Sequence, residues 1–240
     1  MNADRSDLQS RRSLQMGTRT LLIKFAIVLA AVGSVLAATH ATRAQPAAGA
    51  KPLRIVAFGD SLTAGYGLDR GQGFVPVLQR ALQSRGLDVE VIDAGVSGDT
   101  TAAGLARLDW VIDDTADAVI VELGANDALR GQAPAQARAN LDTILTRLGK
   151  RDLPVLLAGM RSPENWGKDY TDSFNDIFTD LAAKHSTLLY PFFLDGVALD
   201  QKLNLPDGMH PNAAGIKVIV ERILPSVEQL VAKAEARRTK

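Results

Sequence analysis

Residues 53–65 read Leu-Arg-Ile-Val-Ala-Phe-Gly-Asp-Ser-Leu-Thr-Ala-Gly, and this stretch decides the fold prediction. The apolar run at residues 53–58 has the length and composition of a strand that is buried on both faces. It ends abruptly in Gly59-Asp60-Ser61. Open α/β sheets keep their active sites where a strand ends in a glycine-rich turn. We therefore expect Ser61, the hydroxyl on the tight part of this turn, to be a nucleophile.

The same alternation of strand and helix patterns continues along the chain. Four further apolar runs of strand length lie at residues 89–92, 118–123, 153–158 and 188–190. Apolar residues recur at helical spacing at residues 73–85, 105–112, 141–148 and 170–181, and again beyond residue 212. This order predicts an α/β fold with a five-stranded parallel sheet and helices on both of its faces.

Three polar turns, at residues 59–65, 95–100 and 124–127, each follow a predicted strand. The carboxyl ends of parallel strands meet at one edge of a sheet, so we expect these turns to converge. An acyl-transfer site needs hydrogen-bond donors for the developing oxyanion. The candidates at this edge are the backbone N–H groups of Ser61 and Gly98 and the side-chain amide of Asn126. Glycine and asparagine are also ordinary turn residues, so each candidate alone is weak evidence.

A serine nucleophile needs a base, and residues 45–240 contain two histidines, His185 and His210. His210 follows Asp207 by three residues, so one turn of chain can bring the carboxylate against the imidazole. A carboxylate there fixes the tautomer and stabilises the imidazolium that forms when Ser61 loses its proton. We expect His210 to be the base and Asp207 its orienting partner. The alternative is that both are ordinary polar residues at the N-terminus of the last helix. His185 fits better as the C-terminal residue of a helix.

The first 44 residues have the features of an export signal. The basic residues that precede its apolar run are Arg11, Arg12, Arg19 and Lys24. Residues 25–38 are apolar or small, and small residues near position 44 suit cleavage by signal peptidase. A membrane anchor is the alternative, but this run is shorter than the roughly 20 residues of a spanning helix. We predict a signal peptide at 1–44, a linker at 45–52, a hydrolase domain at 53–240, and a periplasmic or secreted protein without a stable anchor.

The composition excludes several classes of function. Residues 45–240 hold 21 Lys and Arg against 25 Asp and Glu, a net charge of −4, so the domain has no electrostatic reason to bind nucleic acid. The chain has no cysteine, which rules out disulfides, zinc–thiolate sites and a cysteine nucleophile. A P-loop and the Gly-x-Ser-x-Gly elbow of α/β-hydrolases are both absent. A binding module that kept the fold without catalysis stays open as an alternative, and we expect a monomer.

These blocks together resemble one family, the GDSL or SGNH hydrolases. The matching residues, in the family's order and spacing, are Ser61 in Gly-Asp-Ser-Leu, Gly98, Asn126, and Asp207 with His210. The resemblance runs from about residue 54 to the C-terminal helix. It implies a flavodoxin-like three-layer α/β/α sandwich without a cofactor or metal. It also implies that Ser61 is the nucleophile, that Asp207 and His210 complete the triad, and that Ser61, Gly98 and Asn126 form the oxyanion hole.

Within that family, the chain is most similar to the bacterial periplasmic thioesterase, protease and lysophospholipase subgroup, whose members are often called arylesterases. The segments that carry this likeness are residues 105–108, 121–124, 129–131 and 191–193. The likeness implies an esterase acting on small esters, thioesters or lysolipids, with a carbohydrate O-acetylesterase as the alternative. Ser162 and Pro163 fall in the subgroup's substrate loop. Ser162 stands where an aliphatic residue is expected, so we expect a preference for short acyl chains or aryl esters.

Overall fold

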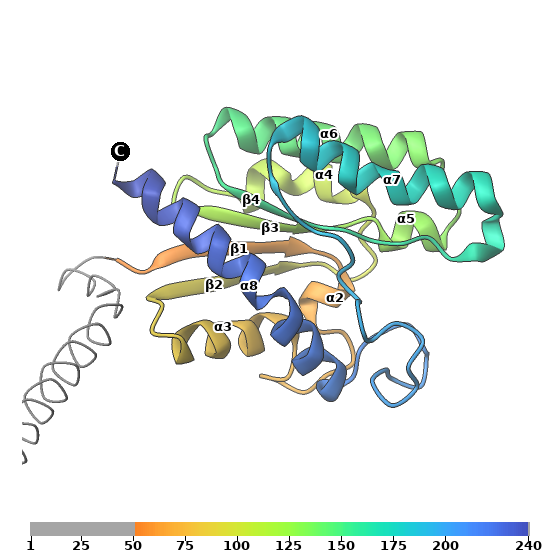
Figure 1. Cartoon of the computed structure of the whole chain (residues 1–240), viewed down its shortest axis with the longest axis horizontal. Coiled ribbons are helices and arrows are strands. Elements are labelled where there is room, and N and C mark those ends of the chain that lie inside the picture. Colours follow the sequence, from red (N-terminus) through yellow and green to blue (C-terminus); the bar gives the residue numbers. More distant parts are fainter. Residues whose placement is uncertain (1–50, 240) are drawn as a thin grey trace, which may run out of the picture. The chain divides into compact units, whose positions relative to one another are not determined.

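Five parallel strands in the order β2-β1-β3-β4-β5 form the centre of the structure, a computed structural model that describes residues 51–239 (Figure 1). The strands are β1 (Leu53–Gly59), β2 (Val89–Gly95), β3 (Ala118–Glu122), β4 (Val155–Ala158) and β5 (Leu188–Tyr190). The predicted parallel sheet is confirmed. The fourth strand begins two residues later than predicted, because Pro154 has no N–H to donate to the sheet. The predicted signal peptide lies outside the described residues, as does the linker up to residue 50.

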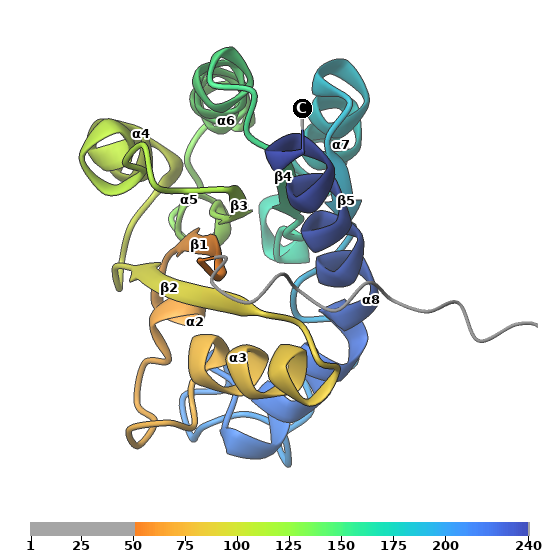
Figure 2. The same cartoon turned by 90° about the vertical axis from the view of Figure 1, so that its left-hand side faces the viewer.

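Helices cover both faces of this sheet, which confirms the three-layer sandwich. The helices are α2 (Ser61–Ala64), α3 (Phe74–Ser84), α4 (Thr101–Val111), α5 (Ala125–Leu129), α6 (Pro134–Lys150), the 3₁₀ helix η1 (Glu164–Trp166), α7 (Lys168–His185) and α8 (Ala213–Arg238). Helices α3 and α8 pack together on one face, and α4, α6 and α7 lie side by side on the other (Figure 2). No helix in the described part of the chain is long and apolar enough to span a membrane.

The burial of each strand follows its place in the sheet. The residues of β3 are all buried and those of β1 nearly all, as expected for central strands with helices on both faces. Edge strand β2 alternates between buried and more exposed residues. The side chains of Phe58, Phe74 and Phe174 are fully buried. Burying one such side chain contributes roughly 1.5–3 kcal/mol.

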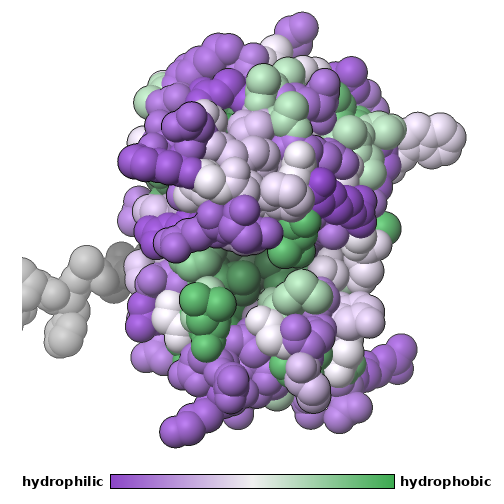
Figure 3. Space-filling model, turned by 90° about the vertical axis from the view of Figure 1, so that its right-hand side faces the viewer, coloured by the Kyte–Doolittle hydropathy of each residue, from purple (hydrophilic) through white to green (hydrophobic). Residues whose placement is uncertain are grey.

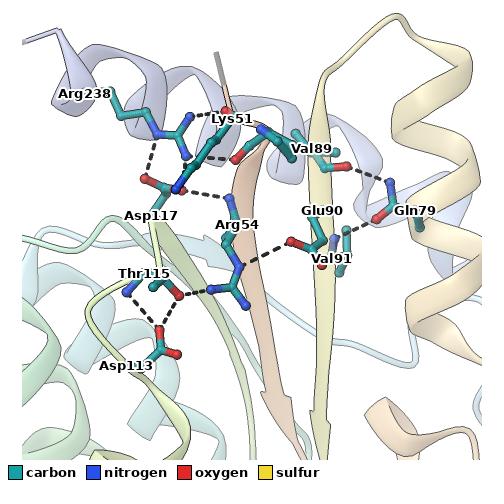
Figure 4. A network of polar contacts seen from close by, with 11 residues as sticks. Lys51, Arg54, Gln79, Val89, Glu90, Val91, Asp113, Thr115, Asp117 and Arg238 are labelled. Carbon is teal, nitrogen blue, oxygen red and sulfur yellow. Dashed lines mark hydrogen bonds and ion pairs between the residues drawn. The ribbon is translucent and has the colours of Figure 1, made fainter. Parts of the chain in front are cut away.

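The amino edge of the sheet is held by a network of polar contacts around Asp117 (Figure 4). Arg238, the last residue of α8, donates two hydrogen bonds to the Asp117 carboxylate, at 2.8 and 2.6 Å. Its guanidinium also donates to the carbonyls of Lys51 and Pro52, at 2.7 and 2.9 Å. The backbone N–H of Arg54 reaches the same carboxylate at 2.8 Å. These bonds tie the end of α8 to the start of β1.

The opposite, carboxyl edge carries the three predicted turns. The chain passes from β1 to β2 on one side and returns across β1 to β3, so the direction of winding reverses between β1 and β3. Open α/β sheets with this strand order bind ligands at that reversal. The residues after β1 and β3, which include Ser61 and Asn126, therefore flank the position where a ligand is expected.

Candidate active site

Ser61 lies where β1 turns directly into α2. Asp60 is the N-cap of α2, and its Oδ1 accepts a hydrogen bond from the Leu62 N–H at 3.0 Å. Because Ser61 is the first residue of α2, its own N–H has no acceptor within the helix. Only 8% of Ser61 is exposed. The turn thus fixes both the Ser61 hydroxyl and a backbone donor at the carboxyl edge.

The structure brings Ser61, His210 and Asp207 together as predicted. Ser61 Oγ lies 2.9 Å from His210 Nε2, and His210 Nδ1 lies 2.7 Å from Asp207 Oδ2. With the Nδ1 proton donated to the carboxylate, Nε2 is free to accept the serine proton. The Tyr66 ring lies against the imidazole, with 4.5 Å between the ring centroids. Ser61, His210 and Asp207 thus form one continuous chain of hydrogen-bonding groups.

His210 reaches Ser61 from the loop that joins β5 to α8. Hydrogen bonds on both sides of His210 hold this part of the loop. The Leu205 N–H donates to the His210 carbonyl at 2.7 Å, and Asn212 caps α8 by accepting from the Ala214 and Gly215 N–H groups. The other histidine, His185, ends α7 as predicted, and its Nε2 lies 2.6 Å from Asp142 Oδ1.

The three predicted oxyanion donors lie on the turns after β1, β2 and β3. The Asn126 amide Nδ2 donates to Asp60 Oδ2 at 3.1 Å, which joins the β3 turn to the β1 turn. Gly98 has a φ of +87°, a conformation that glycine adopts without strain. The buried Asp127 carboxylate accepts from the Thr101 N–H at 2.8 Å and from the Thr101 hydroxyl at 2.6 Å, which joins the β3 turn to the β2 turn.

Known proteins resemble this chain in sequence and in structure. The sequence profile described as GDSL-like Lipase/Acylhydrolase family matches residues 57–218. The chain belongs to this family. It is 40% identical to "Esterase TesA" of Pseudomonas aeruginosa over 77% of this chain and 91% of that protein. It is 36% identical to "Thioesterase 1/protease 1/lysophospholipase L1" of Escherichia coli K12 over 74% of this chain and 84% of that protein.

A solved structure gives the same result. The crystal structure of AlinE4, described as an SGNH-hydrolase family esterase, is 46% identical to the chain with a TM-score of 0.64, covering 75% of this chain and 97% of that one. This GDSL-family protein is thus a serine esterase, a carboxylic ester hydrolase with the SGNH fold. Among residues 51–239, no group of three or more His, Asp or Glu side chains could hold a metal ion.

A buried pair of carboxyl groups, which was not among the predicted site residues, supports the serine turn of this hydrolase. Glu122 Oε2 accepts from the Thr63 hydroxyl at 2.8 Å and from the Asp60 N–H at 3.4 Å, whereas Oε1 has no partner in the described chain. Burial, and then the charge of Asp60, raises the pKa of Glu122 well above its usual value. Burial also raises the pKa of Asp60 to about 6.

The hydrogen bonds indicate which member of the pair carries the charge. Both Asp60 oxygens accept hydrogen bonds, as an ionised carboxylate does, whereas the Glu122 carboxyl is fully buried beside that charge, which favours its neutral form. We therefore assign the negative charge to Asp60 and the proton to Glu122. The signal in the sequence was a single acidic residue at the end of an otherwise apolar strand, Ala-Val-Ile-Val-Glu. An acid in such a run is expected only when it has buried partners.

Ser162 and Pro163, the predicted substrate-binding residues, lie in the loop that follows β4. Ser162 is buried; its hydroxyl donates to the Pro163 carbonyl at 2.8 Å, and its N–H donates to Asn175 at 2.9 Å. It also lines a cavity of about 400 Å³ together with Met160, Asn175 and Thr179. The triad residues are not among the residues that line this cavity.

The face that carries the site has an apolar hollow across its middle, between two largely polar halves (Figure 3). Three exposed large apolar residues lie within three positions of a candidate site residue in the sequence: Val96, Leu129 and Met209. Val96 precedes Gly98 by two residues, and Met209 directly precedes His210. Apolar surface beside a nucleophile suits an acyl chain or an aryl group more than a charged ligand.

Proposed function

We propose that Ser61 is the nucleophile of this esterase, His210 its general base and acid, and Asp207 the group that orients His210. The observation that carries this proposal is the unbroken chain from Ser61 Oγ to His210 Nε2 at 2.9 Å and from His210 Nδ1 to Asp207 at 2.7 Å. Ser61 Oγ attacks the acyl carbon while Nε2 takes its proton. The charged imidazole is then stabilised by the carboxylate.

The oxyanion of the tetrahedral intermediate is bound by the Ser61 N–H, the Gly98 N–H and the Asn126 amide. Collapse of the intermediate breaks the bond to the leaving group, which takes the proton from His210 and departs as an alcohol or a thiol. A water molecule then attacks the acyl-enzyme, with His210 again accepting a proton. His210 returns that proton to Ser61 as the carboxylic acid leaves. The donors stabilise charge that exists only near the transition states.

Small carboxylic esters, thioesters and lysophospholipids are the proposed substrates. The apolar hollow on the face at the carboxyl edge of the sheet supports an acyl or aryl group (Figure 3). The names of the relatives, esterase and thioesterase/lysophospholipase, support the same classes of bond. The alternative, a carbohydrate O-acetylesterase, is not favoured by these relatives.

Ser162 and Pro163 are proposed to bind the acyl chain and to shift the preference toward short or aryl esters. Each methylene contact that is lost is worth about 0.8 kcal/mol. Replacing Ser162 by leucine should therefore raise kcat/KM for octanoyl relative to butyryl esters. An unchanged chain-length profile would remove Ser162 from the substrate site.

The proposed setting is a monomer that acts in the periplasm or outside the cell after its signal peptide is removed. Cell fractionation followed by determination of the N-terminal residue would locate the mature protein. Light scattering of the purified protein would measure its mass. A mature N-terminus upstream of residue 30, or a stable dimer, would contradict these two proposals.

The triad is tested by labelling with a fluorophosphonate and by a hydrolysis screen. Wild type should be labelled on Ser61 and should hydrolyse p-nitrophenyl butyrate, and Ser61→Ala should lose both properties. His210→Asn should lose hydrolysis, whereas His185→Asn, a matched change of the other histidine, should retain it. Labelling of another residue, or no labelling of wild type, would argue for a different site or for a binding protein.

A further inference from the structure

Arg130 lies beside Gly98 and Asn126, the two proposed oxyanion donors that are not part of the serine turn. It directly follows α5, and its Nη2 donates to the Gly98 carbonyl at 3.1 Å and to Asn126 Oδ1 at 3.4 Å. The two acceptors belong to turns after different strands. One guanidinium therefore bridges the β2 turn and the β3 turn at the position where the oxyanion is expected to bind.

Arg130 and Asp60 together fix the direction in which the Asn126 amide points. Asn126 Oδ1 faces the guanidinium, and Nδ2 donates one of its two protons to Asp60 at 3.1 Å. A flipped amide would set Nδ2 against the donors of Arg130 and Oδ1 against the Asp60 carboxylate, and both contacts would be repulsive. The second Nδ2 proton is consequently held in one direction and stays available for an oxyanion.

Arg130 also holds the Gly98 backbone, by donating to its carbonyl. The turn that contains Gly98 is closed by the Asp99 N–H donating to the Val96 carbonyl at 3.1 Å. Arg130 Nη2 is the one atom within 4 Å of the position where a Gly98 Cβ would stand, at 3.7 Å. Without the bond from Arg130, the Gly98 carbonyl would have no partner from the β3 turn, and the peptide units on either side of Gly98 would have more freedom to rotate.

Two aromatic residues before and within α7 hold the segment that carries Arg130. The Trp166 Nε1–H donates to the Ala128 carbonyl at 2.8 Å, and the Tyr170 hydroxyl donates to the Gln132 carbonyl at 2.8 Å. The Trp166 ring also packs on Gly131, where a Cβ would lie only 2.7 Å from the ring. The backbone on both sides of Arg130 is thereby fixed. None of the ion pairs within residues 51–239 includes Arg130, so its donors serve neutral acceptors.

We propose that Arg130 is a positioning residue for the oxyanion hole, which holds the Asn126 amide and the Gly98 turn in the orientation that the transition state requires. This inference rests on the proposed function, since it assigns Gly98 and Asn126 to the hole. A residue of this kind acts on the transition state more than on the bound substrate, so its loss should lower kcat and leave KM nearly unchanged.

The test compares Arg130→Ala with Arg138→Ala in the otherwise intact chain. Arg138 is a half-buried arginine of α6 whose guanidinium pairs with Asp180 of α7 at 2.9 Å, so it serves a helix–helix contact and not the turns of the site. With p-nitrophenyl butyrate, Arg130→Ala should lower kcat about 10- to 50-fold, less than the loss of a whole donor, with KM within about twofold. The inhibition constant of a trifluoromethyl ketone, whose adduct places an oxyanion in the hole, should rise by a similar factor. Arg138→Ala should leave all three values unchanged.

Two further measurements separate positioning from other roles. Added guanidinium ion should restore part of the activity of Arg130→Ala, and the melting temperature should match wild type. A loss confined to butyryl-CoA, with unchanged hydrolysis of the neutral ester, would show that Arg130 binds an anionic leaving group and would overturn the proposal. A lowered melting temperature without rescue would overturn it as well. A wild-type protein that neither hydrolyses esters nor reacts with fluorophosphonate would instead refute the proposed function.

Discussion

Asp207 accepts hydrogen bonds from both the backbone and the side chain of His210. The His210 N–H, together with the Met209 N–H and the imidazole, lowers the pKa of Asp207 to about 2. A lowered pKa means that this carboxylate stays ionised throughout the range in which an esterase is assayed. Protonation of Asp207 therefore cannot explain a loss of activity at mildly acidic pH, whereas protonation of Asp60, whose pKa is raised to about 6 by burial, can.

Replacing Asp207 by asparagine should lower kcat about 10³- to 10⁴-fold with little change in KM. An amide in this place can donate to Nδ1, which favours the tautomer with a proton on Nε2, and that tautomer cannot accept the proton of Ser61. The matched control is Asp195→Asn in the same loop, where the exposed carboxylate pairs with Arg222. Kinetics with p-nitrophenyl butyrate measure both variants. A loss of less than tenfold would contradict the assigned role.

The buried pair of Asp60 and Glu122 gives a prediction for stability against pH. An acid whose pKa is raised on folding binds more protons in the folded state, so its contribution to stability falls as pH rises above its unfolded pKa. For Glu122 this unfolded value is about 4.3. Glu122→Gln keeps a neutral side chain of the same shape. We expect the free energy of unfolding of this variant, relative to wild type, to increase by more than about 1 kcal/mol between pH 5 and pH 9.

Urea unfolding at several pH values measures this difference. Glu122→Leu serves as the comparison, because it removes the acceptor for Thr63 and Asp60 and should be less stable than wild type at every pH. If the difference between Glu122→Gln and wild type stayed constant with pH, the proton would not be on Glu122.

At the scale of the elements, the short helix α2 packs directly against the ends of β1 and β2, where glycines leave room for it. A Cβ on Gly59 would overlap the Thr63 hydroxyl and lie 2.6 Å from Glu122 Oε2, and a Cβ on Gly95 would overlap the backbone of Ala64. The sequence pattern predicts the turn at Ser61 but neither α2 nor α5. Helices of four and five residues are too short for helical periodicity to be recognised.

Two glycine-to-alanine changes should have opposite effects on stability. Gly59→Ala should lower the free energy of unfolding by about 1–3 kcal/mol, because the added methyl group has no space. Gly149 lies in α6 with nothing within 4 Å of a Cβ and no positive φ. Gly149→Ala should raise the free energy of unfolding by about 0.4–1 kcal/mol. Urea unfolding checks both values, and a neutral Gly59→Ala would mean that the turn can relax.

At the scale of the whole molecule, one edge of the sheet carries the candidate site and the other carries contacts that stabilise the fold. The carboxyl edge carries the site, and the amino edge carries the contacts of Arg238 with Asp117 and with the chain before β1 (Figure 4). Asp117 is 8% exposed, so losing Arg238 would leave a largely buried carboxylate with fewer partners.

Arg238→Met should therefore lower the free energy of unfolding by about 2–3 kcal/mol while kcat and KM of the folded enzyme stay unchanged. Arg147→Met is the control, since its pair with Asp109 is exposed and should contribute less than about 1 kcal/mol. Thermal unfolding and esterase kinetics at 25 °C measure the two properties. A change in kcat for Arg238→Met would show that the two edges are coupled.

The sequence by itself determined the sheet, its parallel direction and the edge at which Ser61, Gly98 and Asn126 gather. Strands buried on both faces are recognisable as apolar runs, and parallel strands end at the same edge. It also pointed to His210, because the part of the chain that forms the domain has one other histidine.

Only the tertiary structure decided that Arg130 bridges Gly98 and Asn126, and that Glu122 lies beneath the serine turn. Arg130 and Gly98 are 32 residues apart, and Glu122 and Asp60 are 62 apart. No local pattern encodes such pairs, because a hydrogen bond depends on the distance and angle between two groups after the sheet has assembled. The residues that we propose for the triad could thus be recognised along the chain, whereas the groups that hold their turns in place became visible only in three dimensions.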